Sequence, residues 1–199
     1  MRNTLFLSLL LFAIVCRAQN FSSEVWHDGY AVTVEQDTIR GFIKYDMVSN
    51  IILVSRNNVV QSFSSHKVFY VQIFDKLVEN YRQFYSIPYS VNFDYEVPIL
   101  FEVLYEGPLS LLSREAITTE TVNSASGLYG NSFMREVVNY SYYFLDKQGK
   151  IDFFSGRKAD LLEIMAKKQS QITNFIKKNK MDTGNIRDLI RITAFYNSL

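Results

Sequence analysis

Short apolar runs separated by polar turns dominate residues 29–154. The strongest example is Val97–Glu115, in which the apolar runs Ile99–Tyr105 and Leu109–Leu112 flank Glu106–Pro108. Apolar runs with β-branched and aromatic residues on either side of a glycine-containing turn predict a β-hairpin. Both runs are apolar at most positions, so neither face of this hairpin suits exposure to water. We therefore expect it to lie at the centre of the core.

Two further hairpins are predicted upstream, each with a short polar connection. Their strands are Gly29–Val34 with Thr38–Tyr45, and Ile51–Ser55 with Val59–Phe63. The second connection is Arg56-Asn57-Asn58, and asparagine tolerates a positive φ. Gly41 lies inside a predicted strand, which suggests a bulge or a close backbone approach. Pro88 and Pro98 argue against helix before the central hairpin. The remaining predicted strands are Val68–Phe74, Tyr81–Tyr85, Val137–Asp146 and Ile151–Phe154.

The segment Ala116–Arg135 turns to Thr, Ser, Asn and Gly, and this composition predicts a long loop. Loops of more than about 12–15 residues are usually functional or disordered. Four apolar side chains within it favour a partner that covers them, and we expect Ser124–Met134 to be the least ordered mature segment. A dispensable insertion is the alternative. The candidate partner-binding residues are Leu128, Tyr129, Phe133 and Met134.

From Ser155 the apolar spacing changes to the helical period of about 3.6 residues. Asn185, with Asp188 three residues later, resembles a helix start, and Gly184 is expected to end the preceding helix. The predicted fold is α+β: an antiparallel curved sheet or small barrel or roll, followed by two or three C-terminal amphipathic helices. We expect one domain over residues 19–199, with a β-rich part to 154 and a helical part from 155.

The first eighteen residues have the pattern of a secretory signal peptide. Arg2 precedes the apolar run Leu5–Cys16, and Ala18 is the small residue before the expected cut. The run is shorter than the roughly 20 residues that span a membrane, so no transmembrane span is expected in the mature chain. Lipid modification of Cys16 is an alternative, although Val15 is larger than that processing usually accepts. Export to the periplasm, the outer membrane or the exterior is therefore expected.

Export removes the only cysteine, so thiol chemistry and cysteine-held metals are excluded from the mature chain. Residues 19–154 carry 10 basic and 16 acidic groups, whereas residues 155–199 carry 9 and 4. The near-neutral total argues against nucleic acid as a partner. A basic helical surface could face anionic envelope components, or its lysines could simply be solvated. No phosphate-binding glycine loop is present, and the sequence indicates no cofactor.

Catalytic and metal-binding patterns are equally absent from the sequence. His27 and His66 are far apart and in polar surroundings, which suits surface or loop histidines. Carboxylates remain: Asp94 and Glu96 share a strand face and could serve a glycan hydrolase, which needs a carboxylate pair. Glu102 lies in an apolar strand of the central hairpin, with Glu106 beside it, and could pair with Arg114. None is assigned a catalytic role.

Aromatic residues crowd the run before the central hairpin. They fit a buried sheet core, because aromatics favour strands; exposed, they would form a stacking platform for sugars or an interface. The residues are Tyr81, Phe84, Tyr85, Tyr89, Phe93 and Tyr95.

A resemblance is carried by three features: the signal peptide ending Ala18-Gln19, the Gly29…Asp37-Thr-Ile-Arg-Gly-Phe-Ile43 hairpin, and the tail ending Phe195-Tyr-Asn197. Together they resemble uncharacterised exported proteins of Bacteroidota. The resemblance implies an envelope location and supplies no activity. The expected function is a non-catalytic module that binds an envelope protein or another envelope component. The alternatives are a carboxylate-dependent glycan hydrolase and a carrier of an apolar ligand.

Overall fold

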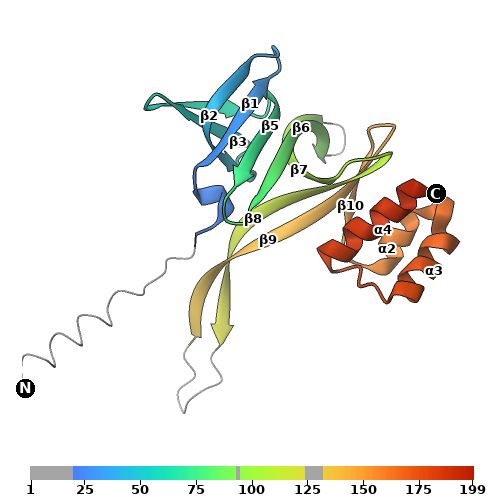
Figure 1. Cartoon of the computed structure of the whole chain (residues 1–199). Helices are drawn as coiled ribbons and strands as arrows, with labels where there is room; N and C mark the ends of the chain where they lie inside the picture. Colours follow the sequence, from blue (N-terminus) through green and yellow to red (C-terminus); the bar gives the residue numbers. More distant parts are fainter. Residues whose placement is uncertain (1–19, 93–94, 124–131) are drawn as a thin grey trace, which may run out of the picture.

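The computed structural model describes residues 20–92, 95–123 and 132–199. Its ten strands form one antiparallel sheet that does not close, in the order β10-β9-β8-β7-β6-β5-β1-β2-β3-β4 (Figure 1). The strands are β1 (His27–Thr33), β2 (Thr38–Asp46), β3 (Ile51–Arg56), β4 (Val59–Ser64), β5 (Val68–Asp75), β6 (Asn80–Asn92), β7 (Tyr95–Tyr105), β8 (Leu109–Asn123), β9 (Ser132–Asp146) and β10 (Ile151–Phe154).

Helices precede the first strand and follow the last strand of the sheet. A short 3-10 helix, η1 (Ser22–Glu24), precedes β1 and contacts β2. After β10 come α2 (Lys158–Ile164), η2 (Ala166–Lys168), α3 (Gln169–Asn179) and α4 (Ile186–Ser198). The three α-helices lie together beside β7, β8 and β10. The predicted antiparallel sheet with C-terminal helices is therefore confirmed, and the sheet is open rather than a barrel. In the described part of the chain, no helix has both the length and the apolar character needed to cross a membrane.

The predicted central hairpin is confirmed as β7 and β8, and it connects all three hydrophobic clusters. Strands β1–β6 form a strongly curved part of the sheet, which we call the curl. Leu100 lies in a cluster on the inner face of the curl, together with Ile43, Ile52 and Phe84. Its neighbour Phe101 points to the opposite face, into a second cluster with Leu112. Leu111 belongs to the third cluster, which the C-terminal helices cover. All of these side chains are fully buried, so both faces of the hairpin are shielded from water.

The two upstream hairpins are also confirmed. Asn57 and Asn58 connect β3 to β4 with φ values of 51° and 62°, as expected for a two-residue turn of the type favoured in hairpins. Gly41 makes the predicted close approach: a Cβ there would collide with the carbonyl oxygen of Ser55. β1 pairs with β2 on one side and with β5 on the other, which places the first strand inside the sheet.

One predicted strand limit was wrong. β6 does not end near Tyr85 but continues past Pro88, which pairs directly with Pro98 of β7. Pro88 lies beyond the part of β6 that pairs with β5, and Pro98 lies beyond the part of β7 that pairs with β8. The missing N–H groups therefore leave no acceptor unpaired in those neighbouring strands.

The described ends of the predicted loop Ala116–Arg135 are instead β-strands, paired with each other as the outer part of a β-hairpin. β8 and β9 pair continuously from Leu109–Asp146 to Asn123–Ser132. Thr118, Thr119 and Thr121 are β-branched and favour strands, so a polar composition misled the loop prediction. Figure 1 shows this ribbon projecting away from the rest of the sheet. We call its outer part, residues 116–123 and 132–139, the arm; the rest of the predicted loop, 124–131, lies outside the described residues.

The helix-start prediction at Asn185 is confirmed, because its side chain accepts a hydrogen bond from the Arg187 N–H at 2.9 Å. The preceding helix does not extend to Gly184, however. It ends at Asn179, after which Lys180 takes a left-handed conformation with φ 51°.

Asn197 near the end of α4 attaches the helices to the central hairpin. Its amide accepts a hydrogen bond from the Leu109 N–H and donates one to the Leu109 carbonyl, both at 2.9 Å. The Asn197 side-chain amide thus bonds to the first residue of β8 as the backbone of a neighbouring strand would. The last turn of the chain is thereby fixed to a residue 88 positions upstream.

We expect Asn197→Ala to lower the free energy of unfolding by about 1–3 kcal/mol, because two backbone groups lose a buried partner. Chemical denaturation followed by circular dichroism measures this. Asn179→Ala is the matched control: the Asn179 amide reaches only the Phe175 carbonyl of its own helix and is exposed. An equal shift in both variants would contradict the attachment role.

Candidate functional site

The densest group of ionisable side chains surrounds Arg82, inside the curl of the sheet. The Arg82 Nε and Nη2 atoms donate to the two carboxylate oxygens of Glu102, both at 2.7 Å. Nη2 also donates to Glu115 at 2.8 Å, and Nη1 donates to Asp75 at 3.2 Å. The Tyr45 hydroxyl accepts from Nη1 and donates to Glu115 at 2.8 Å. One guanidinium therefore holds three carboxylates from β5, β7 and β8. We call these five residues the arginine cluster.

All five side chains of the arginine cluster are buried. Burial raises the pKa of the Tyr45 hydroxyl far above its ordinary value, and Glu115 adds to the effect, although Arg82 opposes it. Burial alone would lower the pKa of Arg82, but the hydrogen bonds and charge of Glu102 raise it instead. Burial would likewise raise the pKa of Asp75, yet hydrogen bonds from Ser22, the Leu77 N–H and Arg82 lower it. These shifts favour the ionised forms of Asp75 and Arg82 and the neutral form of Tyr45.

His27 borders the arginine cluster, contrary to the expectation of a surface or loop histidine. Its ring is buried on β1, with Nε2 at 2.7 Å from the Ser22 carbonyl oxygen and Nδ1 at 3.8 Å from Asp75 Oδ1. The alternation of strand residues places His27 opposite Ile43, on the inner face. His66 is exposed between β4 and β5, as expected.

Glu102 is buried as its position suggested, but its partner is Arg82 rather than Arg114. Glu102 pairs across strands with Ser113, so the next residue, Arg114, points to the opposite face. Arg114 instead donates to the Leu100 carbonyl at 2.6 Å, to the Asn50 side chain at 3.0 Å and to the Met47 carbonyl. This arginine therefore ties the turn between β2 and β3 to the central hairpin.

Of the carboxylate pair suggested for glycan hydrolysis, Asp94 and Glu96, the structure describes only Glu96. Glu96 is exposed on β7, and Glu106 is exposed in the turn of the central hairpin. Asp94 lies outside the described residues. Glu102 and Glu115 do converge, but each binds Arg82 and both are buried. Their oxygens are committed to hydrogen bonds within the protein rather than available to a substrate.

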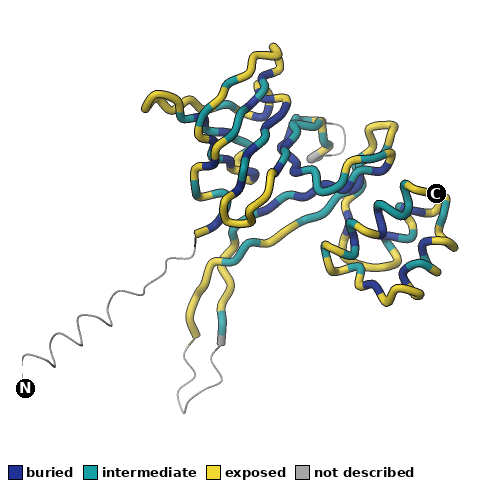
Figure 2. Tube along the Cα trace, in the orientation of Figure 1, coloured by how far each residue is buried: buried dark blue, intermediate teal, exposed yellow. Residues whose placement is uncertain are grey.

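The arm carries the two candidate contact residues that the structure describes. Phe133 and Met134 are adjacent on β9, so they point to opposite faces, and they are 53% and 77% exposed. Leu128 and Tyr129 fall outside the described residues. Figure 2 shows most of the arm in the colour of exposed residues, with most of the remainder intermediate. A two-stranded ribbon without further cover is only marginally stable in water, so a covering partner would stabilise it.

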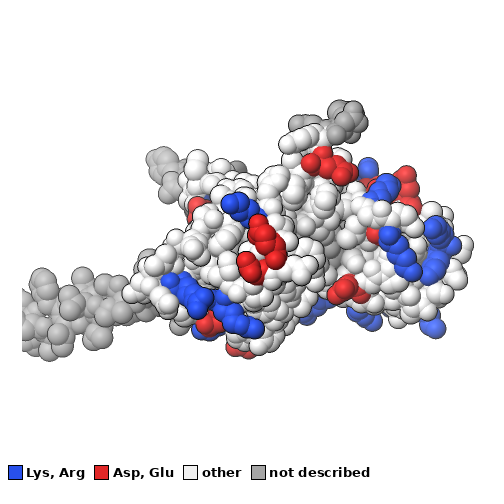
Figure 3. Space-filling model, turned by 90° about the horizontal axis from the view of Figure 1, so that it is seen from above, with Lys and Arg blue, Asp and Glu red and all other residues white. Residues whose placement is uncertain are grey.

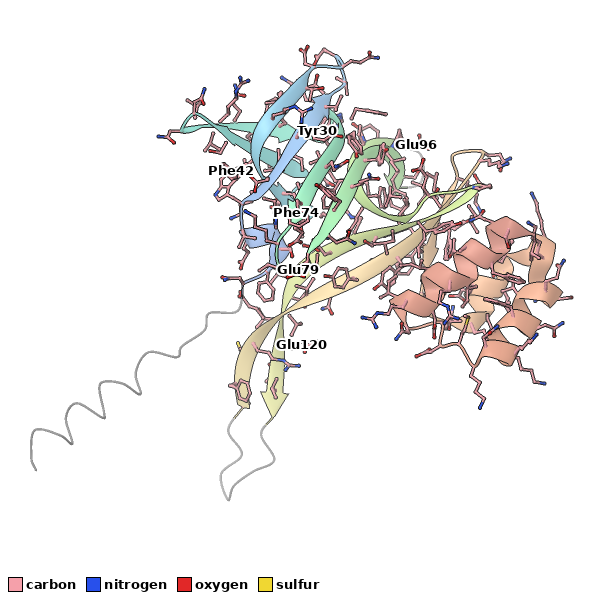
Figure 4. The ribbon with its side chains drawn as sticks, in the orientation of Figure 1. Tyr30, Phe42, Phe74, Glu79, Glu96 and Glu120 are labelled. Atoms are coloured by element: carbon pink, nitrogen blue, oxygen red, sulfur yellow. The ribbon has the colours of Figure 1, made fainter. Side chains whose placement is uncertain are left out.

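A second exposed apolar area lies on the outer face of the curl, opposite the side that holds Ile43 and Ile73. Residues that pair directly on neighbouring strands share a face of the sheet. Phe74 of β5 pairs with Tyr81 of β6 and with Asp28 of β1. Asp28 in turn pairs with Phe42 of β2, so these four residues form one row across the outer face. The rings of Phe74 and Tyr81 meet edge to face at 5.1 Å. Figure 4 shows Phe42, Phe74 and Tyr30 on these strands, away from the helices.

The aromatic run before the central hairpin is therefore divided between core and surface. Phe84 is fully buried, whereas Tyr81 and Tyr95 are exposed. Tyr85 and Tyr89 are half-buried, and Phe93 lies outside the described residues.

Two cavities open on the surface. One of about 510 Å³ has an apolar floor of Ile51, Leu53 and Ile117 beside Lys44 and Tyr45. The other, of about 880 Å³, lies between the β9–β10 turn and the helices and mixes basic with acidic side chains. Lysine and arginine side chains recur over the helical end in Figure 3, consistent with the basic character of that part.

Among the residues described, no three His, Cys, Asp or Glu side chains are grouped so that they could hold a metal ion. Comparisons with protein-family models, with curated proteins and with solved structures find no match.

Proposed function

We propose that the chain is an exported, non-catalytic binding module of the cell envelope, and that its arm is the contact for a partner protein. The observation that carries the proposal is the arm itself: a projecting two-stranded ribbon with a large apolar side chain exposed on each face. The signal-peptide pattern and the resemblance to exported proteins of Bacteroidota support the envelope location.

The arm fits a protein partner better than a small ligand. Beyond Ser113, the described part of β8 pairs only with β9, so the ribbon has two open edges that a partner strand could extend. Phe133 and Met134 add apolar anchors, and methionine adapts readily to differently shaped surfaces. Glu120 and Arg135 form an exposed ion pair at 3.5 Å that borders these anchors with polar groups, as at the rim of an interface.

The arginine cluster supports a non-catalytic role, because its carboxylates are used to bind Arg82. A general acid or base must reach a substrate proton at hydrogen-bond distance. In the cluster, Glu102 is bidentate to Arg82 and also accepts from Ser113 at 3.1 Å, so both of its oxygens are already hydrogen-bonded within the protein. The cluster is best explained as the polar centre that fixes the register of β5, β6, β7 and β8.

Photo-crosslinking tests the arm. A photoreactive phenylalanine analogue at position 133, in protein mixed with detergent-solubilised envelope proteins, is expected to give a discrete protein adduct. Position 153 is the matched control, because Phe153 is a phenylalanine of nearly equal exposure on β10. Exposed substitutions away from special features rarely change stability, so Phe133→Ser with Met134→Ser should remove binding while leaving the fold intact. Equal adducts at 133 and 153 would contradict the proposal.

A carrier of an apolar ligand is the second candidate, and the cavity of about 510 Å³ favours it. Strand alternation places Leu53 on the outer face, so this site lies outside the curl rather than within it. The volume falls in the range of small-molecule sites, and Lys44 could bind an anionic head group. Saturable binding of a fatty acid by calorimetry, lost in Leu53→Asp but retained in Phe133→Ser, would favour this function over the first.

A further inference from the structure

The two edge strands of the sheet differ in how they are protected. β10 has 4 residues, includes Asp152 and leads into α2. β4 has 6 residues, Val-Val-Gln-Ser-Phe-Ser, with no charge, proline or glycine. Natural sheets usually protect an edge with charges, proline or a very short strand, because an open edge pairs with other strands. β4 has none of these protections.

The turn before β4 determines which backbone groups are free. In a hairpin with a two-residue turn, the pair that closes the turn is hydrogen-bonded, and here that pair is Arg56 with Val59. Along an antiparallel pair of strands, hydrogen-bonded residue pairs alternate with pairs that are not hydrogen-bonded. Val59, Gln61 and Phe63 therefore direct their N–H and C=O groups to β3. Val60 and Ser62 direct theirs outward, away from the sheet. The tip of this hairpin projects from the body (Figure 2) and most of β4 is exposed, with Val59 and Val60 61% and 56% accessible.

We propose that β4 pairs antiparallel with β4 of a second copy of the chain, about a two-fold axis through Gln61. Val60 then lies opposite Ser62 of the second copy, and the two outward-facing pairs form about four hydrogen bonds. Val59 lies opposite Phe63 of the second copy, in the pairs whose side chains are closest. The sheet becomes continuous across the two molecules.

Features of the strand favour a second copy as the occupant, in this register. An uncharged strand can face itself without placing like charges together, and pairing about Gln61 matches valine with phenylalanine at both ends. A register shifted toward Ser64 is disfavoured, because the adjoining Ser65 donates to the Pro98 carbonyl at 2.6 Å and accepts from Ser86. The proposal is independent of the arm and of any envelope partner.

Disulfide trapping tests the register. In a Cys16→Ser background the chain has no cysteine, so Gln61→Cys supplies one thiol per copy, placed on the axis at a distance that a disulfide can bridge. Mild oxidation is expected to convert most of this variant into a covalent dimer. Gln171→Cys, exposed on α3, is the control and should stay monomeric. Dimer yields as low at position 61 as at position 171 would overturn the register.

Sedimentation equilibrium tests the association itself. The unmodified chain is expected to dimerise with increasing concentration. Gln61→Lys places two lysines face to face, which should weaken dimerisation by more than about tenfold, because juxtaposed like charges cost several kcal/mol. Thr38→Lys adds the same charge to an exposed site on β2 and should leave the dimer intact. A monomer at all concentrations, or a dimer that persists in Gln61→Lys with unchanged circular dichroism, would overturn the proposal.

Discussion

Replacing Arg82 by methionine is expected to lower the free energy of unfolding by about 3–5 kcal/mol, the usual effect of removing one partner from a buried ion pair. Arg82 is the only described cation within salt-bridge distance of Glu102 and Glu115. Without it, these carboxylates and Asp75 stay buried close together and lose the guanidinium that they share. Their repulsion and lost hydration both oppose folding.

Urea unfolding followed by fluorescence measures the Arg82 effect, and Arg135→Met is the matched control. Arg135 pairs with Glu120 at 3.5 Å on the exposed arm, so its loss should cost less than about 1 kcal/mol. Arg82→Lys should restore only part of the stability, because lysine cannot bind Glu102 through two parallel hydrogen bonds. Equal shifts for Arg82→Met and Arg135→Met would show that the arginine cluster does not stabilise the fold.

Phe101→Ala is expected to cost about 3–5 kcal/mol, the range for deleting a buried phenylalanine ring. Phe101 is fully buried in the cluster on the second face of the central hairpin. Its ring meets Tyr143 of β9 at 5.1 Å and Tyr89 of β6 at 5.8 Å, both nearly edge to face. The variant leaves a cavity among the side chains of β6, β7 and β9. Because these paired strands are held in place by the sheet, they cannot readily move in to fill it.

The control for Phe101→Ala is Phe153→Ala, which removes a half-exposed ring that also contacts Tyr143, at 5.5 Å. Its cost should be much smaller, because less of the ring is buried. Thermal unfolding by calorimetry compares the two variants. If both lost the same stability, the second face of the hairpin would not be a packed core.

Local patterns in the sequence were enough to predict much of the sheet. Short turns such as Asn57-Asn58 restrict which strands can pair, so β3–β4 and the central β7–β8 hairpin were predicted correctly. The arm was missed because threonine counts as polar in composition but favours strands in its backbone preference. The predicted strand stopped at Tyr85, but β6 continues through Pro88, which lies where β6 no longer pairs with β5 and needs no N–H on that side.

The arginine cluster could not be predicted from local patterns, because it depends on the register of strands distant in sequence. Arg82 and Glu102 meet only when β6 and β7 pair as they do, and Tyr45 arrives from β2. One signal in the sequence did point to the cluster. Arg82 and Phe84 are two residues apart in a strand and therefore share a face, so the charge of Arg82 lies on the apolar side of β6. His27 was similarly misjudged because its polar neighbours in sequence point away from the face on which it lies.

The position of β1 within the sheet has a consequence for the order of folding. On one side β1 pairs with β2 across a short turn, a contact that can form in microseconds. On its other side Asp28 pairs with Phe74, and this contact must wait for the chain to close a long loop. The β1–β2 hairpin therefore has an unsatisfied edge until β5 arrives. Contacts of such sequence separation slow folding, so joining β1 to β5 is the step at which a newly made chain is most exposed to mispairing.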